Sequence, residues 1–257
     1  MSVMTEEILK KDFGNFLSAG MKIVVHSSLS SLGYVDGGAP TVIKALMDTI
    51  TYSGLIMMPT FTYGREPYDP YSTVAQTGKI PESFRLMQGV SRSMHPTHSF
   101  CAWGKDAQAI LSGHEVVEPF KRGTPLEKFS RQGGYVLLIG VTQTANSLIH
   151  VAQELAGLPY LDRPKTVLVK ESGELKEVVA RRAGCSLGFD KISPFLEKEK
   201  LIQEYKVAEA KVFFINAEEV LNKAIEVLRD NPYTLVCDNQ DCFACNEMKN
   251  FTKSDII

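Results

Sequence analysis

The chain has 257 residues, of which 44% are hydrophobic and 23% charged, and its formal net charge is −2. This composition is typical of a globular protein with one large core. The sequence contains neither a block of basic residues nor a long apolar stretch. Nucleic acid and membranes are therefore not expected as partners.

The N-terminal segment has apolar residues at helical spacing broken by charges, which differs from the continuous apolar run of a signal peptide. Five cysteines, an odd number, favour reduced thiols over a disulfide framework. Both features predict a cytoplasmic protein.

Short apolar runs between turn residues predict buried strands at 22–26, 54–59, 135–141 and 211–215. Helical patterns occupy 40–50, 81–88, 106–111, 125–131, 146–156 and 217–229. The alternation of strands and helices predicts an α/β fold. We expect a single domain over residues 1–232, followed by a cysteine-containing tail over 233–257.

Three local signals fix boundaries within this pattern. Thr124 and Glu127 have the spacing of a capping box with Pro125 at the first helical position, and Asn216 precedes a helix in a similar way. Residues 171–174 separate two β-rich runs, and Ser172-Gly173 can adopt the positive φ of a tight turn. A hairpin is expected there.

A loop rich in Ser and Gly, residues 27–38, follows the first strand. Its backbone N–H groups could line an anion such as a diphosphate. The spacing matches neither a Walker A loop nor a dinucleotide fingerprint, so a plain connection is the alternative.

A polar segment, residues 90–99, contains Arg92, which can pair with a phosphate. His95 and His98 are separated by Pro96 and do not share a helical face. Hydrogen-bonded structural histidines are therefore favoured over a catalytic metal site.

His150 lies in a predicted helix after a strand, with Asn146 and Gln153 on the same face and Glu154 one turn beyond it. An imidazole beside a carboxylate is a plausible general base, because the carboxylate fixes the tautomer and stabilises the imidazolium. A hydrogen-bonded core histidine is the alternative.

Two further groups of residues are candidate binding sites. Cys242 and Cys245 have CxxC spacing, and with Cys237 and the distant Cys185 they could bind a structural zinc ion; free thiols on a tail are the alternative. The second group consists of the carboxylates of Glu66, Asp69 and Glu82, which could bind the ammonium groups of a polycationic substrate. Carboxylates that face only solvent are the alternative.

In chain order, the motifs HSSLSSLGYVDGG, MPTFT, TGKIPESFR, GVSRSMHPTHSFCAWG, GTPLEKF, GGYVLLIGV and NSLIHVAQE resemble the aminoglycoside 3-N-acetyltransferase (antibiotic N-acetyltransferase) family. The resemblance spans residues 21–156. It implies a three-layer α/β/α fold with a central mixed sheet, distinct from the GNAT fold, and acetyl-CoA as co-substrate. The implied acceptor is a small-molecule amine, most simply the 3-amino group of a 2-deoxystreptamine aminoglycoside.

The resemblance also implies roles for individual residues. Coenzyme binding falls to Ser27, Ser28, Leu29 and Ser30, with Arg92, Ser93 and His95 beside the coenzyme. His150 takes the place of the catalytic base, and Asn146 is expected near the substrate.

Two departures from the family pattern concern the partner of His150. Gln153 stands where relatives commonly carry Glu, which leaves Glu154 as the nearby acid. In some relatives an Asp supports the histidine, and Asp190 is the nearest candidate for that role in this chain. Two alternatives therefore remain: an acyltransferase for a non-antibiotic amine, and a coenzyme-binding protein with impaired catalysis. The protein is expected to be a monomer or a homodimer.

Overall fold

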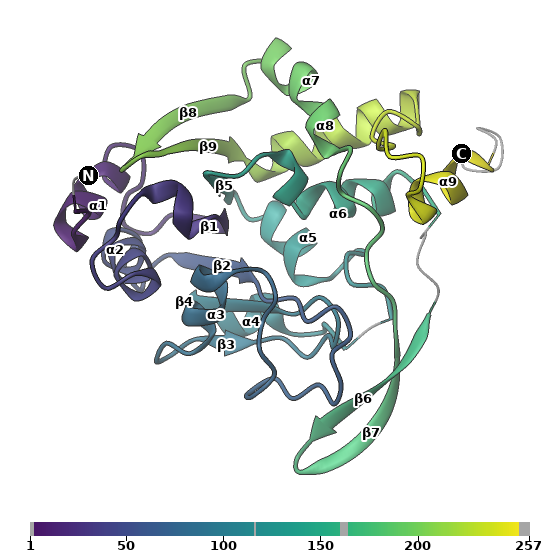
Figure 1. Cartoon of the computed structure of the whole chain (residues 1–257), viewed down its shortest axis with the longest axis horizontal. Coiled ribbons are helices and arrows are strands. Elements are labelled where there is room, and N and C mark those ends of the chain that lie inside the picture. Colours follow the sequence, from purple (N-terminus) through teal and green to yellow (C-terminus); the bar gives the residue numbers. More distant parts are fainter. Residues whose placement is uncertain (1–2, 116, 160–163, 252–257) are drawn as a thin grey trace.

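A seven-stranded mixed sheet forms the centre of the computed structural model, which describes residues 3–115, 117–159 and 164–251 (Figure 1). The strand order is β3-β4-β2-β1-β5-β9-β8. β1 (Lys22–Ser27) is parallel to β2 (Leu55–Pro59) and β5 (Tyr135–Ile139). The other pairs are antiparallel and add β3 (Ser91–Arg92), β4 (Phe100–Gly104), β8 (Ile202–Val207) and β9 (Ala210–Asn216).

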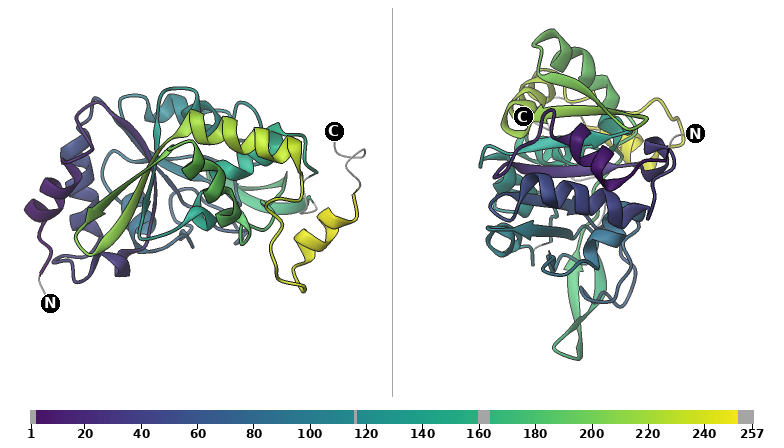
Figure 2. Two further views of the ribbon diagram at one scale, coloured as in Figure 1. Left: turned by 90° about the horizontal axis from the view of Figure 1, so that it is seen from above. Right: turned by 90° about the vertical axis from the view of Figure 1, so that its left-hand side faces the viewer.

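Helices cover both faces of the sheet because side chains alternate along each strand (Figure 2). Ile23 and Val25 pack against α1 (Glu6–Phe13), α2 (Ala39–Ile50) and α3 (Lys79–Arg85). Val24 belongs to the opposite core, which is built with α4 (Ala107–Leu111), α5 (Pro125–Ser130), α6 (Leu148–Leu155), α7 (Ser193–Lys198) and α8 (Ala217–Asp230). The predicted α/β/α fold with a mixed sheet is confirmed.

The predicted strands correspond to β1, β2, β5 and β9, and the predicted helices to α2, α3, α4, α5, α6 and α8. Sequence reasoning missed β3, β4 and β8, together with α7, α9 (Phe243–Lys249) and the short 3-10 helices η1 (Leu29–Leu32), η2 (Gln143–Ala145) and η3 (Phe189–Ile192). β8 lies at the edge of the sheet and is largely exposed, so it lacks the continuous apolar run that marks a buried strand.

The predicted hairpin is confirmed as β6 (Lys165–Glu171) and β7 (Glu174–Ala180). Ser172 and Gly173 have φ of 52° and 89°, as the tight turn requires. The hairpin is separate from the central sheet and projects from the body of the molecule (Figure 1).

One of the two predicted helix caps forms as expected. The Asn216 side chain accepts hydrogen bonds from the N–H groups of Glu218 and Glu219. At Thr124 the predicted helix start is confirmed with Pro125 as its first residue, but the Thr124 hydroxyl donates to the Lys121 carbonyl and makes no cap hydrogen bond. Glu127 accepts from the N–H of Gly123, the residue before the N-cap, so the reciprocal bonds of a capping box do not form.

The described part of the tail packs against the domain. Leu235 and Met248 belong to the same core as α6 and α8, and the ammonium group of Lys191 donates to the Val236 carbonyl. The proposed boundary at residue 232 stays a prediction. In the ranges that the structure describes, no helix is long and apolar enough to cross a bilayer.

Candidate active site

His150 lies on α6 and is nearly buried, with 8% of its surface exposed. Its ring stacks on Phe120 at a centroid distance of 5.2 Å and meets the edge of Phe189 at 4.7 Å. The only hydrogen-bond partner in the described chain at Nδ1 is Gln153, whose Oε1 is 2.9 Å away. Because an amide oxygen can only accept, Nδ1 carries the proton and Nε2 carries the lone pair.

The protonation state of His150 follows from its surroundings. Burial lowers its pKa to about 4, although the hydrogen bond from Nδ1–H to Gln153 opposes this effect. The imidazole is therefore neutral near pH 7. A neutral imidazole with a fixed tautomer can accept a proton at Nε2, as a general base must.

His150 lines a cavity of about 290 Å³ at the C-terminal ends of β1 and β5. The wall includes the side chains of Ser27, Phe61, Asn146 and Phe189, together with residues 183, 184 and 186 from the segment that follows the hairpin. Asn146 is held in place because its amide donates to Gln143 and its carbonyl oxygen accepts from the N–H of Leu148. The predicted base and the predicted substrate residue thus share one cavity.

A second cavity, of about 550 Å³, is formed by the loop after β1 and the start of α3. All four predicted coenzyme residues line it: Ser27, Ser28, Leu29 and Ser30. Ser27 lines both cavities, so the loop cavity and the cavity of His150 are neighbours. The loop is tightly folded, since the Ser31 hydroxyl donates to the Ser28 carbonyl at 2.7 Å. Coenzyme binding by these residues stays a prediction.

Close packing of the loop depends on Gly140, which follows β5 with φ of 63°. A Cβ atom at this position would lie 1.8 Å from the Ser31 hydroxyl oxygen. The loop can approach the end of β5 this closely only because residue 140 has no side chain.

Sequence reasoning missed two residues of these cavities. Lys79 lines the loop cavity and brings an ammonium group to it; the only sequence signal is its place in the quoted motif TGKIPESFR. His26, at the end of β1, lines the His150 cavity, and its Nε2 has no hydrogen-bond partner among the described residues. Burial lowers the pKa of His26 to about 3, so this ring is also neutral.

Arg92, Ser93 and His95 line neither of these two cavities. The Arg92 guanidinium donates to the carbonyls of Thr60 and Thr73 and to the Ser99 hydroxyl. Ser93 bonds to His114, and His95 Nδ1 accepts from the backbone of Thr97 and His98. This geometry shows how the three residues hold the loops of this region, and their expected place beside the coenzyme stays a prediction.

Gln153, and neither predicted acidic partner, lies at His150 Nδ1. Glu154 lines a smaller cavity on the tail side of His150, and burial, reinforced by nearby Glu118, raises its pKa. Asp190 accepts a hydrogen bond from the Thr142 hydroxyl at 3.0 Å. Within the described ranges, Gln153 therefore occupies the place at Nδ1 for which Glu154 and Asp190 were candidates.

The predicted substrate carboxylates lie on and around the loop that follows β2. Glu66 is exposed, whereas Asp69 accepts from the N–H of Tyr71 and lies 3.8 Å from the Lys170 ammonium group. Glu82 forms a two-pronged ion pair with Arg85, which neutralises its charge locally. None of the three lines the His150 cavity.

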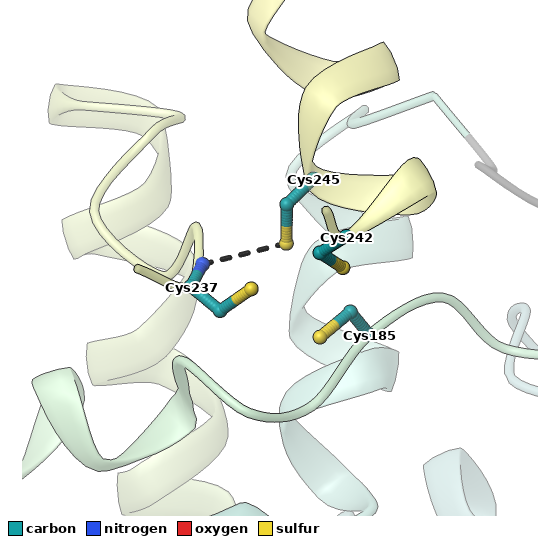
Figure 3. Close-up of side chains that lie close together, drawn as sticks. All are labelled: Cys185, Cys237, Cys242 and Cys245. Atoms are coloured by element: carbon teal, nitrogen blue, oxygen red, sulfur yellow. Dashed lines mark hydrogen bonds between the residues drawn. The ribbon is translucent and has the colours of Figure 1, made fainter. Parts of the chain in front are cut away.

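The four cysteines predicted as metal ligands lie together. The sulfur atoms of Cys185, Cys237, Cys242 and Cys245 are all within 4.8 Å of one another (Figure 3). Cys185 comes from the segment after the hairpin, whereas the other three come from the tail.

Comparison with known proteins finds aminoglycoside N-acetyltransferases and a protein described as similar to them. The family model described as aminoglycoside 3-N-acetyltransferase matches residues 24–229. The SPbeta prophage-derived aminoglycoside N(3')-acetyltransferase-like protein YokD of Bacillus subtilis (strain 168) is 34% identical over 191 residues, which are 63% of this chain and 69% of the relative. Aminoglycoside N(3)-acetyltransferase IV of Salmonella sp is 27% identical over 220 residues, 84% of each chain.

Solved structures agree with this. The apoenzyme of aminoglycoside acetyltransferase AAC(3)-IVa superimposes with a TM-score of 0.87 at 25% identity, covering 97% of this chain and 98% of that one. A mutant of that enzyme in complex with apramycin gives 0.80 at 26% identity, covering 91% and 96%. AAC-IIIb, solved as a binary complex with CoASH, shares the fold at 0.82 and 23% identity, covering 89% and 97%.

The acetyltransferase class and the fold predicted from the sequence are both confirmed by these relatives. The family model covers most of the domain, including the loop after β1 and the whole of α6. The chain therefore belongs to the aminoglycoside 3-N-acetyltransferase family.

Proposed function

We propose that the protein transfers the acetyl group of acetyl-CoA directly to an amine, most simply the 3-amino group of a 2-deoxystreptamine aminoglycoside. One observation carries the proposal: a neutral His150 with a fixed tautomer lines a cavity that shares Ser27 with the loop cavity. A coenzyme seated on residues 27–30 can therefore direct its thioester toward His150. AAC-IIIb has been solved with CoASH, and an AAC(3)-IVa mutant with apramycin.

In this mechanism His150 Nε2 accepts a proton from the acceptor amine while the amine nitrogen forms a bond to the carbonyl carbon. The carbon–sulfur bond then breaks, CoA leaves as its thiolate, and the proton on His150 passes to solvent. Backbone N–H groups of the loop after β1 stabilise the oxyanion of the tetrahedral intermediate. No covalent cysteine intermediate is needed.

Acceptor binding is assigned to Asn146 inside the cavity and to Glu66, Asp69 and Glu82 outside it. Glu82 is already paired with Arg85, so Glu66 and Asp69 would provide most of the attraction for ammonium groups. Glu154 and Asp190 would act on the His150 region through the electric field and not through a direct hydrogen bond to Nδ1.

A second candidate acceptor is a less cationic, non-antibiotic amine. It is favoured by one observation: the described residues lining the cavity of about 290 Å³ include no Asp or Glu, and Glu154 lines only the smaller cavity beside it. A polycationic aminoglycoside gains most from carboxylates close to its ammonium groups.

The proposed setting is the cytoplasm, with a small-molecule acceptor, neither nucleic acid nor a membrane as partner, and a monomer or homodimer as the assembly. Besides acetyl-CoA as co-substrate, we assign a structural zinc ion to the four cysteines that lie together.

The position of the transferred group tests the proposed acceptor. Incubation of the full chain with acetyl-CoA and apramycin or gentamicin, followed by NMR of the purified product, should place the acetyl group on the 3-amino nitrogen. Acetylation at another amine would contradict the regiochemistry, and transfer to simple amines in preference to all aminoglycosides would favour the second candidate.

A further inference from the structure

The cysteine cluster joins two parts of the chain that are far apart in sequence. Cys185 lies in the segment 181–188, between the hairpin and η3. Cys237 precedes α9, Cys242 caps it, and Cys245 lies in its first turn. The four side chains point toward one another from these two segments (Figure 3).

The spacing of the sulfur atoms suits a metal ion. In a tetrahedral zinc site with Zn–S bonds of about 2.3 Å, neighbouring sulfurs are about 3.8 Å apart. The observed sulfurs all lie within 4.8 Å, so a small contraction would complete the tetrahedron. Four thiolates are a donor set that favours zinc or iron over magnesium or calcium.

The environment of the thiols also fits a metal. Cys237 and Cys245 are buried, whereas Cys185 and Cys242 are half-buried, so the cluster is largely shielded from solvent. A dication would offset the cost of holding four thiolates in such a place.

Backbone N–H groups already point at two of the sulfurs. Cys237 donates to Cys245 Sγ at 3.4 Å, and Leu187 donates to Cys185 Sγ at 3.3 Å. Such donors stabilise thiolate ligands and orient them toward the metal. The residues present therefore fit zinc.

The segment that contributes Cys185 also forms a wall of the His150 cavity. Ala183, Gly184 and Ser186 line that cavity, and Gly184 and Cys185 line the smaller cavity on the other side of His150. Residues 181–186 have no regular secondary structure. The position of this wall therefore depends on side-chain and backbone contacts at its two ends.

The first end is held by the core. The Thr97 hydroxyl donates to the Arg181 carbonyl at 2.6 Å, and the N–H of Ala183 donates to His98 Nε2 at 3.4 Å. The second end reaches the tail at Cys185. Close packing continues there, because a Cβ atom at Gly188 would lie 2.2 Å from the Leu235 carbonyl oxygen.

We propose that a zinc ion bound by Cys185, Cys237, Cys242 and Cys245 fastens the tail to segment 181–188 and thereby fixes the wall of the His150 cavity. The metal has no part in the chemical step. The positioning role rests on the proposed function of His150, whereas the metal site and its effect on the segment do not.

Metal content is the first test. The full chain, purified without added metal or chelator, should contain about one zinc per chain by mass spectrometry of the elements. Cys242→Ser should lose most of the zinc, whereas Cys101→Ser, in a buried thiol of β4 outside the cluster, should retain it. Iron in place of zinc, or two disulfides among the four cysteines, would overturn the assignment.

Hydrogen–deuterium exchange tests the positioning role without reference to activity. Zinc removal by a strong chelator should raise exchange at residues 181–188 at least tenfold and leave β1 unchanged, and added zinc, but not magnesium, should restore protection. Unchanged exchange at 181–188 after confirmed zinc loss would refute the proposal that zinc fastens this segment to the tail. Because this measurement needs no turnover, it tests the role of the zinc ion separately from the proposed acetyl transfer.

Discussion

Gln153 Oε1 lies 2.9 Å from His150 Nδ1, at the position for which the family resemblance implies a glutamate. The neutral amide fixes the tautomer of the ring as a carboxylate would. It supplies no negative charge to stabilise the imidazolium, and burial holds the pKa of His150 at about 4. The proposed base thus has a fixed tautomer but is weak.

Restoring the acid should strengthen the base. In Gln153→Glu, a carboxylate next to Nδ1 should raise the pKa of His150 by roughly 1 to 3. The acidic limb of the kcat/KM profile should therefore move to higher pH, and kcat at neutral pH should increase. Glu154→Gln is the matched control and should leave this limb in place. A limb that moves in the control and not in Gln153→Glu would show that Glu154 is the functional partner.

Lys79 should contribute to coenzyme affinity. Lys79 lines the loop cavity together with Ser28 and Ser30, where the proposed function seats the coenzyme phosphates. Lys79→Ala should raise KM for acetyl-CoA about three- to tenfold at low salt with little change in kcat, because an exposed charge pair is worth about 1 kcal/mol. Lys11→Ala, on the surface of α1, provides the control. Equal KM values for all three proteins would exclude Lys79 from coenzyme binding.

The five histidines should make the fold sensitive to acid. His26, His95, His98, His114 and His150 are all buried, and burial lowers the pKa of each below its ordinary value near 6.5. Their folded pKa values lie below the unfolded ones, so the unfolded state binds more protons as the pH falls below about 6.5.

The contribution of the neutral histidines to the free energy of unfolding should be complete above about pH 6.5. The free energy of unfolding should then decrease as the pH falls toward 4. Each histidine contributes about 1.4 kcal/mol per pH unit between its unfolded and folded pKa. Urea unfolding at about pH 7, 6 and 5 measures this slope. A stability that stays constant over this interval would contradict the neutral, buried assignment of these rings.

Local sequence patterns predicted the central strands and most helices because buried strands are short continuous apolar runs, whereas helices repeat their apolar residues every three or four positions. They also predicted the turn at Ser172-Gly173 and the cap at Asn216, whose geometry depends on a few neighbouring residues. The edge strand β8 escaped prediction because its exposed residues carry no such run.

The site was predicted less completely because its contacts join distant segments. The sequence offered Gln153 and Glu154 as neighbours of His150, but only the side-chain directions on α6 show which of them reaches Nδ1. Lys79 and His26 became visible only when β1 and the start of α3 were placed around common cavities. The Arg92 guanidinium can bind a phosphate in principle, yet its N–H groups donate to backbone carbonyls.

The most direct test of the account is free-thiol release from acetyl-CoA across a panel of aminoglycosides, comparing the wild type with His150→Ala. The account predicts turnover by the wild type and a loss of at least about 100-fold in the variant, with acetyl-CoA binding and thermal stability retained. Absence of turnover on every aminoglycoside despite tight coenzyme binding, or equal rates for the two proteins, would contradict it.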